Sequence, residues 1–139
     1  MKTFENLLLM GLVIFTLSLS NCSKNDENDL FKILTTPLWH TDSLLANGLD
    51  ASQPGQLLAK FKGDAKFKDD GTGTFGIYKG TWWFTENRTQ IIIKTDSLAL
   101  PLTCKIVELT ASSFKITTAV PDLIGMTGMI NIRMTFKPK

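Results

Sequence analysis

The stretch AKFKGDAKFKD, residues 59–69, is the clearest guide to how this chain folds. Small or apolar residues occupy its odd positions through Phe67, and Lys or Asp occupies its even positions. A period of two residues is typical of a β-strand with one buried face and one solvated face. We therefore expect a half-buried strand over residues 59–67 and a turn at residues 69–71, where Asp-Asp-Gly interrupts the pattern.

The same period continues along the chain, and turn residues separate its segments. Eight strands are predicted, over residues 38–46, 59–67, 72–77, 80–85, 89–95, 101–109, 113–119 and 129–137, with a tight link at Tyr78 and Lys79. One short helical turn is expected at residues 30–34, ahead of Pro37. The absence of long helical patterns between the strands excludes parallel βαβ units. An all-β fold follows: an eight-stranded antiparallel up-and-down barrel with a short N-terminal helical turn, or alternatively a β-sandwich.

Strand parity separates the side chains that should face the interior from those that should face solvent. The predicted inward set is Trp39, Phe61, Phe67, Phe75, Trp82, Phe84, Ile91, Ile93, Leu102, Cys104, Ile106, Phe114, Ile116, Ile132, Met134 and Phe136. If the barrel is hollow, it offers an apolar lumen for a small molecule, and the candidate ligand-lining residues are Trp39, Phe61, Phe75, Trp82, Phe84, Ile93, Phe114 and Met134. The alternative, which we favour for most of the set, is that the same side chains fill a solid barrel.

Two other features suggest contact with a partner. The segment at residues 118–130 is rich in Met and Gly and forms an adaptable apolar surface, in which the candidate contacts are Leu123, Ile124, Met126 and Met129. The second feature is Trp83, which should point outward if Trp82 points inward. The alternatives are that the segment covers the mouth of the barrel and that the N-terminal turn covers Trp83.

The N-terminal residues differ from the rest of the chain. Lys2 precedes an uncharged apolar run at residues 7–19, which is too short for a membrane-spanning helix and has the layout of a secretory signal. Cys22 follows, and then the polar, mostly acidic residues 23–29. We expect a signal peptide at residues 1–21, an acidic tether at residues 22–29 and one domain at residues 30–139.

Leu19, Ser20, Asn21 and Cys22 resemble a lipobox of the type found in Bacteroidetes lipoproteins. The resemblance implies cleavage before Cys22, acylation of Cys22 by fatty acids such as palmitate, and a protein that the lipid anchors in the outer membrane. The acidic residues after Cys22 also resemble a surface-export signal, which would place the protein on the outer face of that membrane. The alternative for these residues is a simple spacer.

The ordered segments of the domain resemble bacterial lipocalin-like domains. The segments are LWHTDSLLANG (residues 38–48), AKFKDDGTGTF (65–75), KGTWWF (79–84), TQIIIKT (89–95), CKIVELTASSFKI (104–116) and INIRMTFKP (130–138). Pro37-Leu38-Trp39 stands where classical lipocalins have Gly-x-Trp. The resemblance implies a small barrel that binds an apolar small molecule or a partner.

Several classes of function lack a sequence signal. The net charge of +2 does not suggest a nucleic-acid partner. His40 is the only histidine, and with Asp42 and Ser43 it forms no recognised catalytic arrangement. One His and Cys104, which alternates with apolar neighbours, do not suggest a metal site. We therefore expect a protein that is not an enzyme and has no cofactor or metal. It would be a membrane-anchored lipoprotein that binds an apolar small molecule or an envelope protein, or alternatively a structural module that docks another envelope protein.

Overall fold

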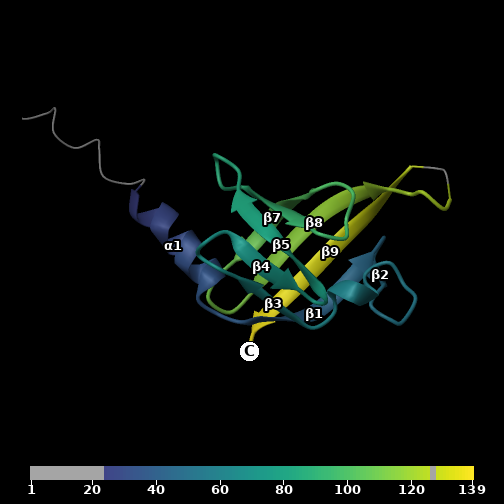
Figure 1. Cartoon of the computed structure of the whole chain (residues 1–139), viewed down its shortest axis with the longest axis horizontal. Helices are drawn as coiled ribbons and strands as arrows, with labels where there is room; N and C mark the ends of the chain where they lie inside the picture. The colour runs from purple at the N-terminus through teal and green to yellow at the C-terminus, as the bar shows by residue number, and fades with distance from the viewer. Residues whose placement is uncertain (1–23, 126–127) are drawn as a thin grey trace, which may run out of the picture.

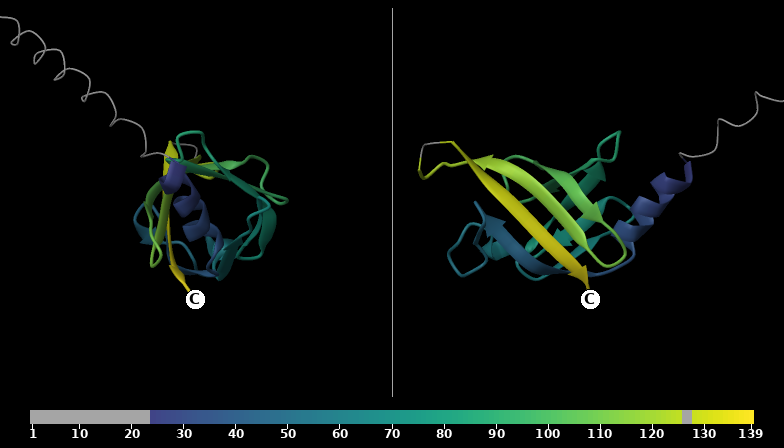
Figure 2. Two further views of the ribbon diagram at one scale, coloured as in Figure 1. Left: turned by 90° about the vertical axis from the view of Figure 1, so that its left-hand side faces the viewer. Right: turned by 180° about the vertical axis from the view of Figure 1, so that it is seen from behind.

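The protein is a closed antiparallel barrel with one helix at its N-terminal side (Figures 1 and 2). The structure is a computed structural model, and it describes residues 24–125 and 128–139. Its elements are α1 (Lys24–Thr35), β1 (Trp39–Ala46), β2 (Leu49–Asp50), the 3₁₀ helix η1 (Ala59–Phe61), β3 (Asp64–Phe67), β4 (Thr72–Phe75), β5 (Tyr78–Phe84), β6 (Gln90–Thr95), β7 (Leu102–Leu109), β8 (Phe114–Pro121) and β9 (Met129–Pro138). The predicted signal peptide and Cys22 lie outside the described residues.

The sheet closes because its first long strand pairs with its last. β1 and β3 to β9 follow one another as antiparallel neighbours, and β1 also pairs with β9 from Trp39↔Pro138 to Ala46↔Ile132. The short β2 is an extra strand that pairs only with β1. Seen from the side of α1, the strands form a ring (Figure 2, left). The predicted eight-stranded up-and-down barrel is confirmed, and the chain does not form a sandwich.

The core is an aromatic cluster inside this ring. Phe114 is fully buried, and its ring centroid lies 5.7 Å from that of Trp39 and 5.6 Å from those of Phe67 and Phe136. Phe67 in turn contacts Phe75 at 5.2 Å and completes the cluster. Burial of each such side chain contributes about 1.5–3 kcal/mol. Tilted and edge-to-face ring pairs add to this stabilisation.

The stretch 59–63 departs from the prediction, because it is not a strand. Residues Ala59–Phe61 form a 3₁₀ turn, and β3 begins only at Asp64. Gly63 has φ of 120°, a conformation that strains any residue with a side chain, and it separates the 3₁₀ turn from β3. Phe61 is nevertheless buried, since the 3₁₀ turn directs its ring against Tyr78 at 4.8 Å.

The link after β4 also lies elsewhere than predicted. Phe75 pairs with Tyr78, so the two-residue turn is Gly76-Ile77 and Tyr78 already belongs to β5. A side chain at Gly76 would overlap the backbone of η1, which explains why the turn occurs at this glycine. The predicted link at Tyr78 and Lys79 is therefore wrong by two residues.

Helix α1 is longer than the single turn predicted, and it covers one end of the barrel. It begins at Lys24, so residues 24–29 of the predicted tether are helical. Leu34 is fully buried, and its carbonyl accepts a hydrogen bond of 2.9 Å from Trp39 Nε1. Lys66 Nζ donates to the carbonyls of Thr35, Thr36 and Pro37 at 2.6, 2.9 and 3.1 Å. These carbonyls would otherwise be unpaired at the negative end of the helix, so Lys66 satisfies them and offsets their charge.

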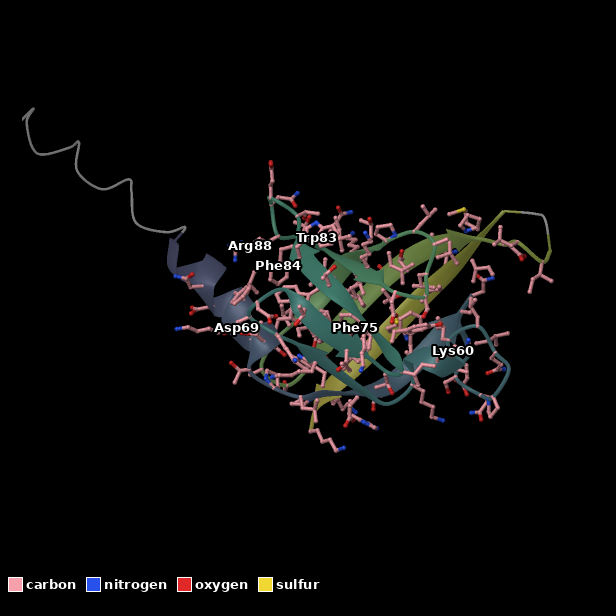
Figure 3. All side chains as sticks on the ribbon, viewed as in Figure 1. Lys60, Asp69, Phe75, Trp83, Phe84 and Arg88 are labelled. Carbon is pink, nitrogen blue, oxygen red and sulfur yellow. The ribbon has the colours of Figure 1, made fainter. Side chains whose placement is uncertain are left out.

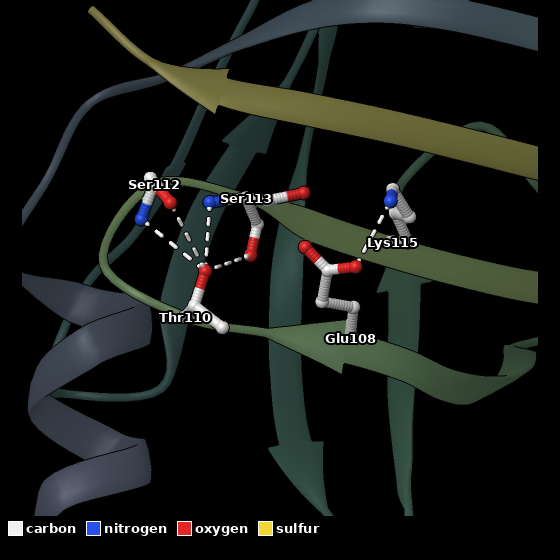
Figure 4. A network of polar contacts seen from close by, with 5 residues as sticks. All are labelled: Glu108, Thr110, Ser112, Ser113 and Lys115. Atoms are coloured by element: carbon white, nitrogen blue, oxygen red, sulfur yellow. Dashed lines mark hydrogen bonds and ion pairs between the residues drawn. The ribbon is translucent and has the colours of Figure 1, made fainter.

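The two ends of the barrel can be named from the direction of the strands. The helix end comprises α1 and the turns at residues 68–71, 85–89 and 110–113, whereas the loop end comprises the connections at residues 47–48, 51–58, 76–77, 96–101 and 122–128. The turns of the helix end are tightly hydrogen bonded. In the β7–β8 turn, Thr110 Oγ1 accepts hydrogen bonds from the amides of Ser112 and Ser113, and Lys115 pairs with Glu108 at 2.9 Å (Figure 4).

Candidate functional site

The side chains predicted to line a ligand lie inside the barrel. Phe84 is half-buried and the others are buried, namely Trp39, Phe61, Phe75, Trp82, Ile93, Phe114 and Met134. In the helix half they belong to the aromatic cluster, where Trp82 lies 5.6 Å from Phe67. Their contacts are with one another, so this half of the barrel is filled. Their role toward a ligand stays a prediction.

The loop end exposes an unusual number of large apolar side chains. Ile124 is 97 % exposed and Leu123 84 %. The exposed residues at this end are Leu49, Leu57, Ile77, Leu100, Leu123, Ile124 and Met129, and we call this set the apolar tips. The predicted partner contacts Leu123, Ile124 and Met129 belong to it, whereas Met126 lies outside the described residues. The sequence did not indicate Leu49, Leu57, Ile77 and Leu100, because Leu49 belongs to β2 and each of the other three stands in a different connection.

The loop end carries charges of both signs. Asp96 and Asp122 lie in its connections and Asp50 lies in β2, whereas the Lys60 carbonyl accepts a hydrogen bond from the Ile77 amide and Lys62 lies close enough to lower the pKa of Asp50. Asp122 Oδ1 accepts hydrogen bonds from the amides of Ile124 and Gly125 at 3.1 and 2.7 Å, which holds the base of that tip. Hydrogen bonds from Gln53 and then from Ser52 lower the pKa of Asp50 to about 2. Asp50 therefore stays ionised at neutral pH.

A groove of about 560 Å³ runs along the outer face of β1, β8 and β9 beside the apolar tips. Leu45 and Ala119 give it apolar surface, and Asn131 and Arg133 give it polar groups. The Asn131 amide donates to Asn47 Oδ1 at 2.9 Å, which ties β9 to the β1–β2 turn. The groove adjoins the β8–β9 loop, because Ala119 pairs with Asn131 only two pairs before that loop begins.

A second depression, of about 510 Å³, lies at the helix end. Its lining comes from α1, the β3–β4 turn, the end of β5 and the β5–β6 turn, and comprises Phe31, Asp69, Asp70, Gly71, Trp82, Trp83, Phe84, Thr85, Glu86 and Arg88. Figure 3 shows Asp69, Trp83, Phe84 and Arg88 on the side of α1, away from Lys60. The predicted interior residues Trp82 and Phe84 thus meet the predicted outward residue Trp83. The sequence offered cover of Trp83 by the N-terminal turn as an alternative; in the structure Phe31 of α1 borders the same depression, and Trp83 stays 42 % exposed.

The residues considered for catalysis form an exposed charged cluster. His40 Nδ1 lies 2.6 Å from Asp64 Oδ1, and Lys139 Nζ lies 3.0 Å from Asp64 Oδ2. The His40 hydrogen bond, followed by that of Lys139, holds the pKa of Asp64 below its usual value. Asp42 instead pairs with Lys137 at 2.9 Å. Within the described residues, no hydrogen bond joins the Ser43 hydroxyl to His40 or Asp64.

The single cysteine of the described residues is inert. Cys104 is buried, and desolvation raises the pKa of its thiol to about 12, so it stays protonated at neutral pH. Among residues 24–125 and 128–139, no three His, Cys, Asp or Glu side chains gather as metal ligands would. Likewise, α1 is too short and too polar to cross a bilayer, and no other described helix could do so.

Comparison with known proteins does not place the chain in a family. No protein-family model and no curated protein sequence matches it. The candidate surfaces are therefore interpreted from their own chemistry.

Proposed function

We propose that the protein is a cell-envelope lipoprotein, anchored in the outer membrane through lipid at Cys22, whose barrel docks a partner envelope protein with its loop end. The observation that carries this proposal is that the apolar tips are exposed and belong to the same end of a barrel whose helix half is filled. The chain enters the barrel through α1 at the opposite end (Figure 1). An anchor ahead of α1 would leave the loop end facing away from the anchoring membrane.

Exposed apolar side chains in such number are typical of an interaction surface. Monomeric proteins seldom expose large contiguous apolar patches, because burying each such side chain in a contact is favourable by about 1.5–3 kcal/mol. Leu123 and Ile124 also contribute nothing to the core, since they are almost fully exposed. A role in recognition accounts for them better than a role in stability.

The carboxylates at the loop end suit a protein partner. Asp50, Asp96 and Asp122 would be repelled by an anionic membrane. They suit a partner with an apolar centre and a rim of basic or N–H groups.

Photo-cross-linking in the host tests the docking proposal. A photoreactive amino acid at Leu123 or Leu100 should trap one specific envelope protein, which mass spectrometry of the adduct identifies. Val107 is the matched control, because it is 56 % exposed but lies on the outer face of β7. The double change Leu123→Ser with Ile124→Ser should abolish the adduct formed through Leu100. Equal trapping from Val107, or no adduct from either tip, contradicts docking through the loop end.

The lipid anchor has its own test. Cells given a radioactive fatty acid should label the protein, and Cys22→Ser should remove the label, whereas Cys104→Ser should keep it. A Cys22→Ser protein that still takes label contradicts the assignment.

The alternative proposal is a small apolar ligand. Native mass spectrometry of protein taken from its own host would then show a bound molecule. A bare mass, and no binding across a panel of apolar compounds, contradicts this alternative.

A further inference from the structure

The depression at the helix end has an aromatic wall built from two elements. Phe31 of α1 lies 5.6 Å from Trp82 of β5, and Trp82 lies 5.5 Å from Phe84. Trp83 borders the same depression and is 42 % exposed, so part of its ring is open to a ligand. The volume of about 510 Å³ lies within the usual range for small-molecule sites.

The charged groups of this depression are mainly negative. Asp69, Asp70 and Glu86 line it, against the single guanidinium of Arg88. Asp70 Oδ1 accepts hydrogen bonds from the amide and hydroxyl of Thr72, and these bonds lower the pKa of Asp70. In the described part of the chain, no hydrogen bond or ion pair involves the Asp69 or Glu86 carboxylate. Two carboxylates at the edge of an aromatic wall are thus available to a ligand.

One ring of this wall, that of Phe84, already contacts a cationic side chain, that of Arg88. The guanidinium carbon of Arg88 lies 5.9 Å from the centre of the Phe84 ring, within the range of a cation–π contact. Arg88 holds this position with a backbone φ of 53°, a conformation that is uncommon for a residue with a side chain and that costs free energy. The face of Phe84 therefore stabilises positive charge in the structure itself.

We propose that the aromatic depression binds a small organic cation, which carries an ammonium or quaternary ammonium group. The Trp83 ring, which borders the depression, would attract the charge through its quadrupole, and Asp69 and Glu86 would attract it through their carboxylates. Anions are repelled by the same carboxylates, and a neutral apolar ligand gains nothing from them. The proposal is independent of docking through the loop end, since the two surfaces lie at opposite ends of the barrel.

Choline and its neutral isostere 3,3-dimethyl-1-butanol give a direct test, because they differ in charge but hardly in shape. Titration of the purified full chain, followed by the indole NMR signals, should show choline shifting the Trp83 signal and binding at least about fivefold more tightly than the alcohol. Asp69→Asn combined with Glu86→Gln should weaken choline binding by about as much. Asp96→Asn combined with Asp122→Asn at the loop end is the matched control and should leave it unchanged.

Each other outcome overturns the proposal. Equal binding of choline and the alcohol would indicate an apolar site, and failure of millimolar choline to shift Trp83 would indicate no cation site. Should a Trp83→Ala variant fail to fold, Trp83→Phe serves in its place. Trp83→Phe keeps an aromatic ring and should retain the preference for choline over the alcohol. If Asp96→Asn combined with Asp122→Asn also lost the preference for choline over the alcohol, the preference would come from the overall charge of the protein and not from this depression.

Discussion

The helix end and the loop end of this barrel differ in their turns and in how far their apolar side chains are buried. At the helix end, short turns bond tightly to themselves, α1 covers the interior, and Phe114 lies among the rings of Trp39, Phe67 and Phe136. At the loop end, the connections at residues 51–58, 96–101 and 122–128 are longer and several apolar side chains face solvent, of which Ile124 is the most exposed. The side chains that stabilise the fold and the surface that we propose for recognition therefore lie at opposite ends of the barrel. Four predictions follow from it, in order of decreasing effect on stability.

The largest effect should come from the aromatic cluster. Phe114→Ala should lower the free energy of unfolding by about 3–5 kcal/mol, because the ring is fully buried and the surrounding rings cannot collapse into its space. Phe61→Ala is the matched change at the loop end, where the ring is 8 % exposed and, among the described residues, pairs with the single ring of Tyr78. Phe61→Ala should lower the free energy of unfolding by less than Phe114→Ala does. Urea unfolding measures both, and equal losses would remove the contrast.

The attachment of α1 should come next. Lys66→Met should cost about 1–2 kcal/mol, since it leaves the carbonyl of Thr35 at the end of α1, and those of Thr36 and Pro37 just after it, without their donor. Amide hydrogen exchange should rise in α1 and stay unchanged in β6 and β7. Lys62→Met is the control, because Lys62 is exposed and makes no side-chain hydrogen bond in the described structure. The interpretation fails if Lys62→Met loosens α1 equally.

A smaller effect should appear as the pH falls. The pKa of Asp50 is lowered to about 2 in the folded protein, whereas an unfolded Asp titrates near about 3.9. A lowered pKa means that the carboxylate stabilises the fold above about pH 4 and that this contribution is lost as the pH falls through about 2.

Carbon-13 NMR of the Asp50 carboxyl measures this titration. Gln53→Ala should raise the pKa of Asp50, because it removes the largest cause of the shift, and Gln90→Ala in β6 should not. An Asp50 that titrates near 4 in the unaltered protein would contradict the hydrogen-bond geometry of the β2 region.

The smallest effect on stability should come from the apolar tips. Leu123→Ser combined with Ile124→Ser should change the free energy of unfolding by no more than about 0.5 kcal/mol, because neither side chain packs against the core. Thermal unfolding measures this. A loss as large as that of Lys66→Met would mean that these tips serve the fold, and the contrast between the two ends would disappear.

The sequence predicted the barrel well because its signal is local. Alternation in β9, from Ile130 to Phe136, requires only that each strand keep one face dry. The same rule failed at residues 59–63, where lysine alternates with Ala59 and Phe61 in a 3₁₀ turn. Period two was present there, but β3 begins only after Gly63 with its positive φ, and no local pattern shows whether a partner strand is in reach. The extent of α1 was missed for a related reason, since residues 24–29 carry few apolar side chains.

The sequence by itself determined the fold class and the parity of the core residues, and it predicts lipidation at Cys22. These follow from the period of the strands and from short contiguous motifs. Only the tertiary structure decided that Leu49 and Ile77 stand at the same end as Ile124, and that Trp83 shares a depression with Phe31 of α1. The reason is physical: closure of the barrel between β1 and β9 fixes which turns share an end and where α1 docks. The relative positions of the turns and of α1 therefore depend on the pairing of all the strands together.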